Sequence, residues 1–249
     1  MLRAPAAALA LAALLSPAAA EAQRPVARST RGLVVLGGER VPVRWTDGDT
    51  FRIQAGRHAG RAARLVGVNA LETYGPVHRW AGIPPRALLA VAKAAAPAAA
   101  RGTWRCEVEG RSDAYGRLLV TCPEAAESLV DSGLAMVFAV DAPADERLLA
   151  AQRRAGAARL GMWAGGVPPL VPTSLHSAGE AGLGSRGAYD RIVDTRTGAA
   201  VVHPHERRYR VCQEVCVGEG PGRACMLYVP FERRYRDRPG CLRGSPPPR

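Results

Sequence analysis

The stretch Thr46-Asp47-Gly48-Asp49-Thr50-Phe51 places two carboxylates on either side of a glycine, directly before an apolar residue. Because Asp-Gly is a common turn pair, it predicts a tight turn that leads into a strand. Two further segments follow, Arg64-Leu65-Val66-Gly67-Val68-Asn69-Ala70-Leu71-Glu72 and Asp113-Ala114-Tyr115-Gly116-Arg117. The three segments supply carboxylates for a hard cation, one carboxylate for a water molecule and two arginines for phosphate oxygens. A metal-assisted phosphodiesterase needs these parts.

Short apolar runs broken by Gly, Asp and Pro surround these segments and predict a small β-rich domain. Strands are expected at 40–46, 49–55, 61–68, 103–109 and 116–122, and helices at 84–99, 124–134 and 144–160. Five short strands with a helix between the third and the fourth fit a Greek-key barrel of the OB type. The predicted class is therefore α+β, with a five-stranded barrel and about three helices. The stretch 32–165 is long enough to bury one core.

Residues 40–163 resemble the staphylococcal nuclease (thermonuclease) family. The resemblance rests on the three segments above and on two later motifs, Glu127-Ser128-Leu129-Val130-x-x-Gly133-Leu134-Ala135 and Gly161-Met162-Trp163. It implies a five-stranded OB barrel that hydrolyses phosphodiester bonds of DNA and RNA with Ca²⁺. The chain is accordingly expected to be a calcium-dependent endonuclease whose partner is its DNA and/or RNA substrate.

The resemblance also implies the roles of single residues. Asp49 matches a direct calcium ligand, and Asp47 matches an outer-shell carboxylate close to the ion. Arg64 and Arg117 match the two arginines that contact the scissile phosphate, to which an arginine can donate two parallel hydrogen bonds. Glu72 matches the carboxylate that orients or deprotonates the attacking water.

Two positions depart from the family pattern. Asn69 stands where family members carry a metal-binding aspartate, and its neutral amide oxygen should bind calcium more weakly. Leu71 replaces the proline that usually precedes Glu72, so this loop is expected to be less rigid.

Tyr115 is expected to touch the substrate phosphate or base, with simple packing as an equal alternative. Strand alternation does not place Arg64 and Asn69 in one pocket; that placement follows from the resemblance.

Three functions stay open at this point. The first is an exported nuclease, which the presence of Arg64, Glu72 and Arg117 favours. The second is a catalytically weak or inactive nucleic-acid-binding OB module, which Asn69 and Leu71 favour. The third is an adhesion or envelope-binding protein that acts through its C-terminal segment. A nuclease is expected to keep its chemistry without residues 172–249, which separates the first function from the third.

The N-terminus has the features of an export signal. A single early cation, Arg3, precedes an Ala- and Leu-rich run that ends near Ala20, which predicts a signal peptide over 1–22. The apolar run is too short to span a membrane comfortably. We therefore expect a periplasmic or secreted protein with no stable membrane association after cleavage. The net charge of +12 favours a polyanionic partner, and no protein partner can be named.

The cysteine spacing predicts disulfides, because an exported chain meets an oxidising compartment. Cys106 and Cys122 flank the 113–117 segment almost symmetrically. If the chain forms a hairpin that turns near residues 112–114, the two cysteines face each other at a distance that a disulfide can bridge.

A linker is expected over 166–187, followed by a small Cys- and Arg-rich C-terminal domain of unknown role over 188–249. Its four cysteines are Cys212, Cys216, Cys225 and Cys241. Export favours two disulfides over a zinc site, although the first spacing also suits zinc. Arginines interleaved with aromatic residues suit either a polyanion-contacting surface or a solvated basic face. They are Arg207, Arg208, Arg210, Arg233, Arg234 and Arg236, with Tyr209, Phe231 and Tyr235.

Overall fold

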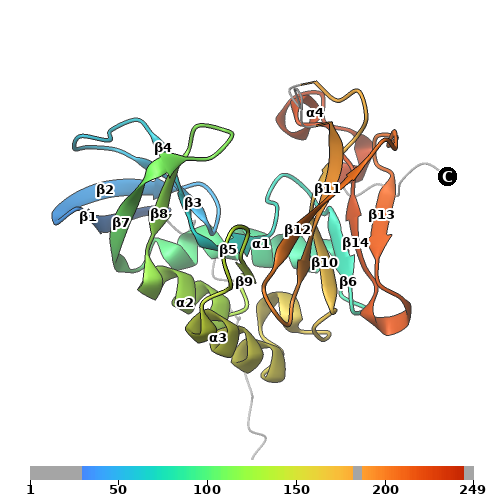
Figure 1. Ribbon diagram of the computed structural model, residues 1–249, viewed down its shortest axis with the longest axis horizontal. Coiled ribbons are helices and arrows are strands. Elements are labelled where there is room, and N and C mark those ends of the chain that lie inside the picture. The colour runs from blue at the N-terminus through green and yellow to red at the C-terminus, as the bar shows by residue number, and fades with distance from the viewer. Residues whose placement is uncertain (1–29, 182–186, 244–249) are drawn as a thin grey trace, which may run out of the picture.

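The structure is a computed structural model that describes residues 30–181 and 187–243 (Figure 1). The predicted signal peptide, 1–22, lies outside the described residues. Figure 1 shows a barrel on one side of the molecule and the C-terminal strands on the other, with helices beneath and between them. Within the described residues, no helix is long and apolar enough to cross a membrane.

The fold class is confirmed as α+β with a small closed barrel. Its strands follow one another in the order β1-β2-β3-β4-β8-β7. Their bounds are β1 Arg31–Leu36, β2 Glu39–Trp45, β3 Thr50–Ile53, β4 Ala62–Leu65, β7 Thr103–Ser112 and β8 Leu118–Thr121. Side chains that alternate along these strands fill the interior, including Val34, Val43, Phe51, Leu65 and Val120.

The barrel has six strands where the sequence predicts five. The additional strand, β1, pairs antiparallel with β2 and parallel with β7, and so closes the barrel. Its inward positions, Val34 and Leu36, are buried. In the sequence, Leu33 to Leu36 form a continuous apolar run after a polar segment, without the polar–apolar alternation of a half-buried strand, and no strand was predicted there.

The helices lie close to their predicted places. They are α1 (Pro85–Ala99), α2 (Pro123–Asp131) and α3 (Glu146–Ala157). Pro85 begins α1, where a missing N–H costs nothing, and the Asp145 side chain caps α3 by accepting from the Arg147 N–H at 2.7 Å. A two-stranded sheet of β5 (Gly67–Ala70) and β9 (Ala135–Phe138) packs against α2 and α3.

The C-terminal half forms two small sheets. The first contains β10 (Leu170–His176), β11 (Ala188–Asp194) and β12 (Ala200–His205). The second contains β13 (Glu214–Val217), β14 (Ala224–Leu227) and β6 (His78–Trp80). Short helical turns complete the chain: η1 (Gly161–Trp163), η3 (Gly220–Gly222), α4 (Glu232–Tyr235) and η4 (Gly240–Arg243).

The segment predicted as a linker, 166–187, contains β10, which pairs with β11. Most of this strand is buried, including Val171, Thr173 and Leu175. The proposed domain boundaries stay a prediction. Part of the segment predicted as a linker, residues 170–176, is a strand of a sheet.

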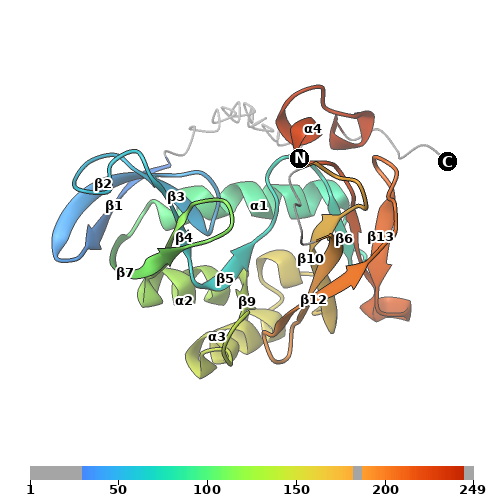
Figure 2. The same cartoon turned by 45° about the horizontal axis from the view of Figure 1, so that its top comes forward.

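The N-terminal and C-terminal halves share a sheet and a core. Strand β6 precedes α1 in the chain and yet pairs with β14, so the second sheet draws strands from both halves. Trp80 and Trp163 lie in one apolar cluster with Val171, Val193 and Ala224. Figure 2 shows α1 running from the barrel towards β6. The C-terminal half is therefore packed onto the N-terminal half of the chain.

All six cysteines are paired. Cys106–Cys122 joins β7 to the end of β8, with 4.3 Å between the Cα atoms, as the hairpin predicted. The C-terminal pairs are Cys212–Cys241 and Cys216–Cys225.

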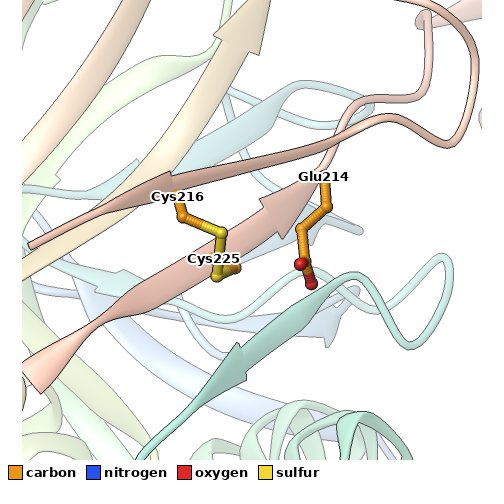
Figure 3. A group of neighbouring side chains, drawn as sticks. All are labelled: Glu214, Cys216 and Cys225. Carbon is orange, nitrogen blue, oxygen red and sulfur yellow. A yellow bond between two sulfur atoms is a disulfide. The ribbon is translucent and has the colours of Figure 1, made fainter. Parts of the chain in front are cut away.

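The zinc alternative fails for the C-terminal cysteines. Glu214, Cys216 and Cys225 come together across β13 and β14 (Figure 3). However, the two sulfur atoms are bonded to each other, and the Glu214 carboxylate binds Arg79, whose Nε lies 2.9 Å from Oε1. Zinc is held by thiolate sulfurs, so these cysteines serve as a disulfide.

The two C-terminal disulfides close loops of different length, with sequence separations of 29 for Cys212–Cys241 and 9 for Cys216–Cys225. In the chain-entropy account their removal lowers the free energy of unfolding by about 3.5 and about 2.5 kcal/mol, respectively. We expect Cys212→Ser with Cys241→Ser to lower the thermal midpoint more than Cys216→Ser with Cys225→Ser, as measured by calorimetry. The reverse order would contradict this account.

Candidate active site

A cavity of about 870 Å³ lies where the barrel, the β5–β9 sheet and the C-terminal half meet. The seven residues predicted to act on metal or substrate all line it: Asp47, Asp49, Arg64, Asn69, Glu72, Tyr115 and Arg117. They come from the turn before β3, from β4 and β5, from the loop after β5 and from the β7–β8 hairpin. The structure thus brings the predicted constellation together in one cavity.

The turn Asp47-Gly48-Asp49 sets the floor of the site. The Asp49 N–H donates to Asp47 Oδ1 at 3.2 Å, which closes the turn locally. A Cβ atom on Gly48 would lie 2.6 Å from the Ala95 Cβ on α1 and 2.9 Å from the Ala70 Cβ on β5. Only glycine lets the turn lie this close to the helix and strand, so packing fixes where Asp49 enters β3.

Asp49 is buried at 4% exposure and fully hydrogen-bonded. Its Oδ2 lies 2.6 Å from Arg64 Nη1 and accepts the Ala70 N–H at 3.0 Å, while its Oδ1 accepts the Thr50 hydroxyl at 2.9 Å. Burial raises the pKa of Asp49, but the Arg64 guanidinium, the hydrogen bonds with Asp47 and Ala70 and the charge of Arg117 together outweigh burial and hold the pKa below its usual value. Burial and the Asp49 carboxylate raise the pKa of Asp47 well above its usual value. One negative charge is therefore fixed at the floor of the cavity.

Asn69 lies on β5 within reach of Arg64. Its Oδ1 accepts from Arg64 Nη2 at 3.1 Å, and its Nδ2 donates to the Ala70 carbonyl at 2.9 Å. Simple alternation from Arg64 would turn Asn69 to the opposite face. The alternation is reset at Gly67, the first residue of β5, where the backbone adopts a φ of +84°.

The second arginine is held by its own hairpin turn. Arg117 Nε donates to Asp113 Oδ2 at 2.7 Å, and the backbone N–H groups of Tyr115 and Arg117 donate to Asp113 Oδ1. Arg117 Nη1 also donates to the Thr50 hydroxyl at 3.2 Å. Because that hydroxyl donates to Asp49, one chain of polar contacts connects Arg64, Asp49, Thr50 and Arg117.

Tyr115 is 62% exposed at the cavity mouth. The guanidinium of Arg117 lies over its ring, with 5.5 Å between Cζ and the ring centroid. The exposure excludes core packing as the role of this ring and leaves much of the ring accessible at the cavity mouth.

Glu72 follows the buried Leu71 at the end of β5 and is half-buried. Its backbone N–H donates to Nε2 of the buried His78 at 3.5 Å. Burial lowers the pKa of His78 to about 4, so this imidazole is neutral and accepts. Burial also raises the pKa of Glu72 above its usual value, although Arg234, Arg64 and Arg117 lower it.

Several cavity residues were not predicted as part of the site. Phe231, Arg234 and Tyr235 reach it from the region of α4, and Ser174, His176, Tyr189 and Arg191 reach it from β10 and β11. The interleaved arginines and aromatic residues were visible in the sequence. Their place beside Glu72 was not, because it depends on how the C-terminal half packs.

The chemistry of the donors fits a calcium ion. Asp47 and Asp49 offer carboxylate oxygens and Asn69 an amide oxygen, the ligand class that Ca²⁺ prefers. Asp49 Oδ2 and Asn69 Oδ1 converge on the single guanidinium of Arg64, so these oxygens already point to a common positive charge. A calcium ion bound there would share them with Arg64.

Comparison with known proteins agrees with the geometry over part of the chain. A search of curated proteins found no match. The family model described as "Staphylococcal nuclease homologue" matches residues 62–165, a range that includes Arg64, Asn69, Glu72 and Arg117. This part of the chain is therefore a domain of the staphylococcal nuclease homologue family.

Proposed function

We propose that the chain is an exported nuclease that hydrolyses phosphodiester bonds of DNA and/or RNA by calcium-assisted attack of water. The observation that carries the proposal is the polar chain from Arg64 through Asp49 and Thr50 to Arg117. It holds two guanidinium groups beside the Glu72 carboxylate in one cavity of a nuclease-family domain. Few functions other than phosphate chemistry need this combination.

In this proposal, Arg64 and Arg117 bind the scissile phosphate. Each guanidinium can donate two hydrogen bonds to phosphate oxygens, and their charge matters most as negative charge grows in the transition state. Their acidic partners, Asp49 and Asp113, hold both groups in place before substrate arrives. Such preorganisation lowers the cost of orienting the donors during the reaction.

Glu72 is proposed to take the proton of the attacking water. A base works best when its pKa approaches the operating pH, and burial shifts the pKa of Glu72 in this direction. The Arg234, Arg64 and Arg117 charges counter this shift because they favour the ionised carboxylate.

Asp49 and Asn69 are proposed to hold the calcium ion, with Asp47 beside it. When bound, the ion supplies positive charge that polarises a phosphate oxygen. Asn69 contributes no charge, so the site carries less negative charge than one built with a third carboxylate, and it should bind calcium more weakly.

Export is part of the proposal. The predicted signal peptide supports it, and so do the three disulfides, because such bonds persist in oxidising compartments. The net charge of +12 suits a nucleic-acid substrate, which an exported protein would meet in the periplasm or in the medium.

One observation favours a second candidate, a nucleic-acid-binding module without catalysis. Asn69 is neutral, and its oxygen already accepts a hydrogen bond from Arg64. If this contact keeps calcium out, the cavity would bind phosphate through its arginines and leave the bond intact.

The proposed function predicts calcium-dependent cleavage by the mature, oxidised protein. We expect single-stranded DNA and RNA to be cut in a calcium titration, no cutting with chelator, and a loss of at least about 100-fold for Glu72→Gln, since general base catalysis supplies about that much. Glu124→Gln, an exposed change on α2, is the matched control. Binding without cleavage at every calcium concentration would establish the second candidate.

The calcium site makes its own prediction. Asn69→Asp adds a carboxylate next to Asp49 and should lower the calcium concentration for half-maximal cleavage several-fold, because ligand charge tunes calcium affinity. The calcium dependence of the initial cleavage rate measures it. An unchanged calcium curve would remove Asn69 from the metal site.

The titration of Glu72 can be measured without catalysis. In calcium-free protein we expect its carboxyl to titrate above 4.5, the usual value, because burial disfavours the charged form. The side-chain ¹³C shift, followed through a pH series and assigned with Glu72→Gln, reports this midpoint. A midpoint at or below 4.5 would contradict the environment proposed for the base.

A further inference from the structure

The loop that carries Glu72 is packed against the C-terminal half. Tyr74 and Val77 lie in one apolar cluster with Val229, Cys241 and Leu242. A Cβ atom on Gly75 would lie 2.5 Å from Leu242 Cδ2 and 3.2 Å from Leu242 Cα. The backbone of the loop therefore packs directly against Leu242. The segment is itself closed by the Cys212–Cys241 disulfide.

Backbone contacts hold the same loop. The Leu227 N–H donates to the Val77 carbonyl at 2.8 Å, and β14 continues the pairing with β6. Arg238 donates a short hydrogen bond to the Tyr74 carbonyl. The loop after Glu72 is thus fixed by partners from β14 to η4, which supply the rigidity that Leu71 was expected to cost.

The same segment delivers a third arginine to the cavity. Arg234 lines it together with Glu72, Arg64 and Arg117. Its Nε donates to the Val229 carbonyl at 3.1 Å, and its Cζ lies 4.9 Å from the centroid of the Tyr74 ring. In the described part of the chain Arg234 forms no ion pair, whereas Arg64 and Arg117 each bind an aspartate. Its position is fixed while its charge remains available to a ligand.

Two exposed aromatic rings flank this arginine. Phe231 is 61% exposed and Tyr235 is 67% exposed, and both line the cavity. Their ring centroids are 6.5 Å apart, and the Arg234 guanidinium lies 5.8 Å from the Phe231 ring. Large exposed rings beside a fixed cation suit a ligand with flat apolar faces and a negative backbone.

We propose that Arg234, Phe231 and Tyr235 form a subsite that binds a phosphate and an unpaired base of the nucleic-acid strand next to the scissile bond. The inference rests on the proposed function, because it extends the same cavity. Stacking on these rings requires a base face that a duplex keeps covered, so the subsite selects single-stranded substrate. The C-terminal half is then part of the active site.

This changes an expectation drawn from the sequence. A nuclease was expected to keep its chemistry without residues 172–249. In the structure, removing them takes away Arg234 and both rings, together with the residues that pack on Tyr74 and Gly75. Point substitutions in the full chain are therefore the right test.

Binding of a fluorescent 12-nucleotide oligo(dT) and of its duplex with oligo(dA) by the full mature chain in chelator tests the subsite apart from catalysis. Phe231→Ala with Tyr235→Ala should weaken single-strand binding at least about five-fold, since stacking on an aromatic ring is worth this much per base. Duplex binding should change much less. These rings are exposed, so the double variant is expected to fold, and its circular dichroism checks this.

The charge is tested by salt dependence. Arg234→Gln should weaken binding and reduce the slope of log affinity against log salt by about 0.7, the value for one phosphate contact on a single strand. Arg236→Gln removes the same charge from an exposed neighbour that does not line the cavity, and it should leave affinity within about two-fold and keep most of the slope. The aromatic variant should keep the wild-type slope.

The outcomes separate the two proposals. If the variants bind as the wild type does while the wild type cleaves DNA, the subsite is wrong and the nuclease stands. If the variants bind less well, and neither they nor the wild type cleave at any calcium concentration, the subsite is supported but the protein binds nucleic acid without cleaving it. If Arg234→Gln and Arg236→Gln lose the same affinity and slope, the effect is general charge and the subsite is overturned.

Discussion

The buried ion pair between Asp49 and Arg64 organises the whole site. Through it the start of β3 is joined to β4, and through the same two residues Asn69 and the Ala70 N–H are drawn in from β5. A buried ion pair gains little stability unless further hydrogen bonds satisfy its atoms, and here Thr50, Ala70 and Asn69 provide them. The pair is best understood as a device that holds a guanidinium at a chosen place. That requirement explains why Gly48 must let the turn pack directly on α1.

The C-terminal half enters the account through the loop after β5. The Glu72 backbone N–H donates to His78 on β6, and the residues that follow Glu72, Tyr74 and Gly75, pack on the C-terminal half. Two disulfides and the shared β6–β14 pairing make that second support firm. The position of the proposed base therefore depends on residues more than 150 positions away in sequence. The packing of the C-terminal half on this loop provides rigidity that a proline at position 71 would otherwise supply.

Much of the barrel and of the site could be predicted because the signals are local. The Asp47-Gly48 turn, the hairpin that pairs Cys106 with Cys122 and the helix that begins at Pro85 each follow from a few neighbouring residues. The missed features depend on distant partners. Strand β1 is identified as a strand only by its pairing with β2 and β7, and β10 only by its pairing with β11.

The same distinction applies within the site. The segments around Asp49, Arg64 and Arg117 could be grouped by motif, but the meeting of Arg64 with Asn69 required the reset of alternation at Gly67. Arg234 belonged to a basic and aromatic pattern that did not connect it to the cavity. Its role is visible only after β14 pairs with β6 and carries the following residues to the cavity.

The most direct test is a crystal structure of the Glu72→Gln full chain with calcium and a short single-stranded oligonucleotide, since this variant should hold its substrate uncut. The account predicts one phosphate between Arg64 and Arg117, a calcium ion on Asp49 and Asn69, and the adjoining phosphate on Arg234 with its base against Phe231 or Tyr235. An oligonucleotide bound elsewhere on the basic surface, with the cavity free of phosphate, would contradict it.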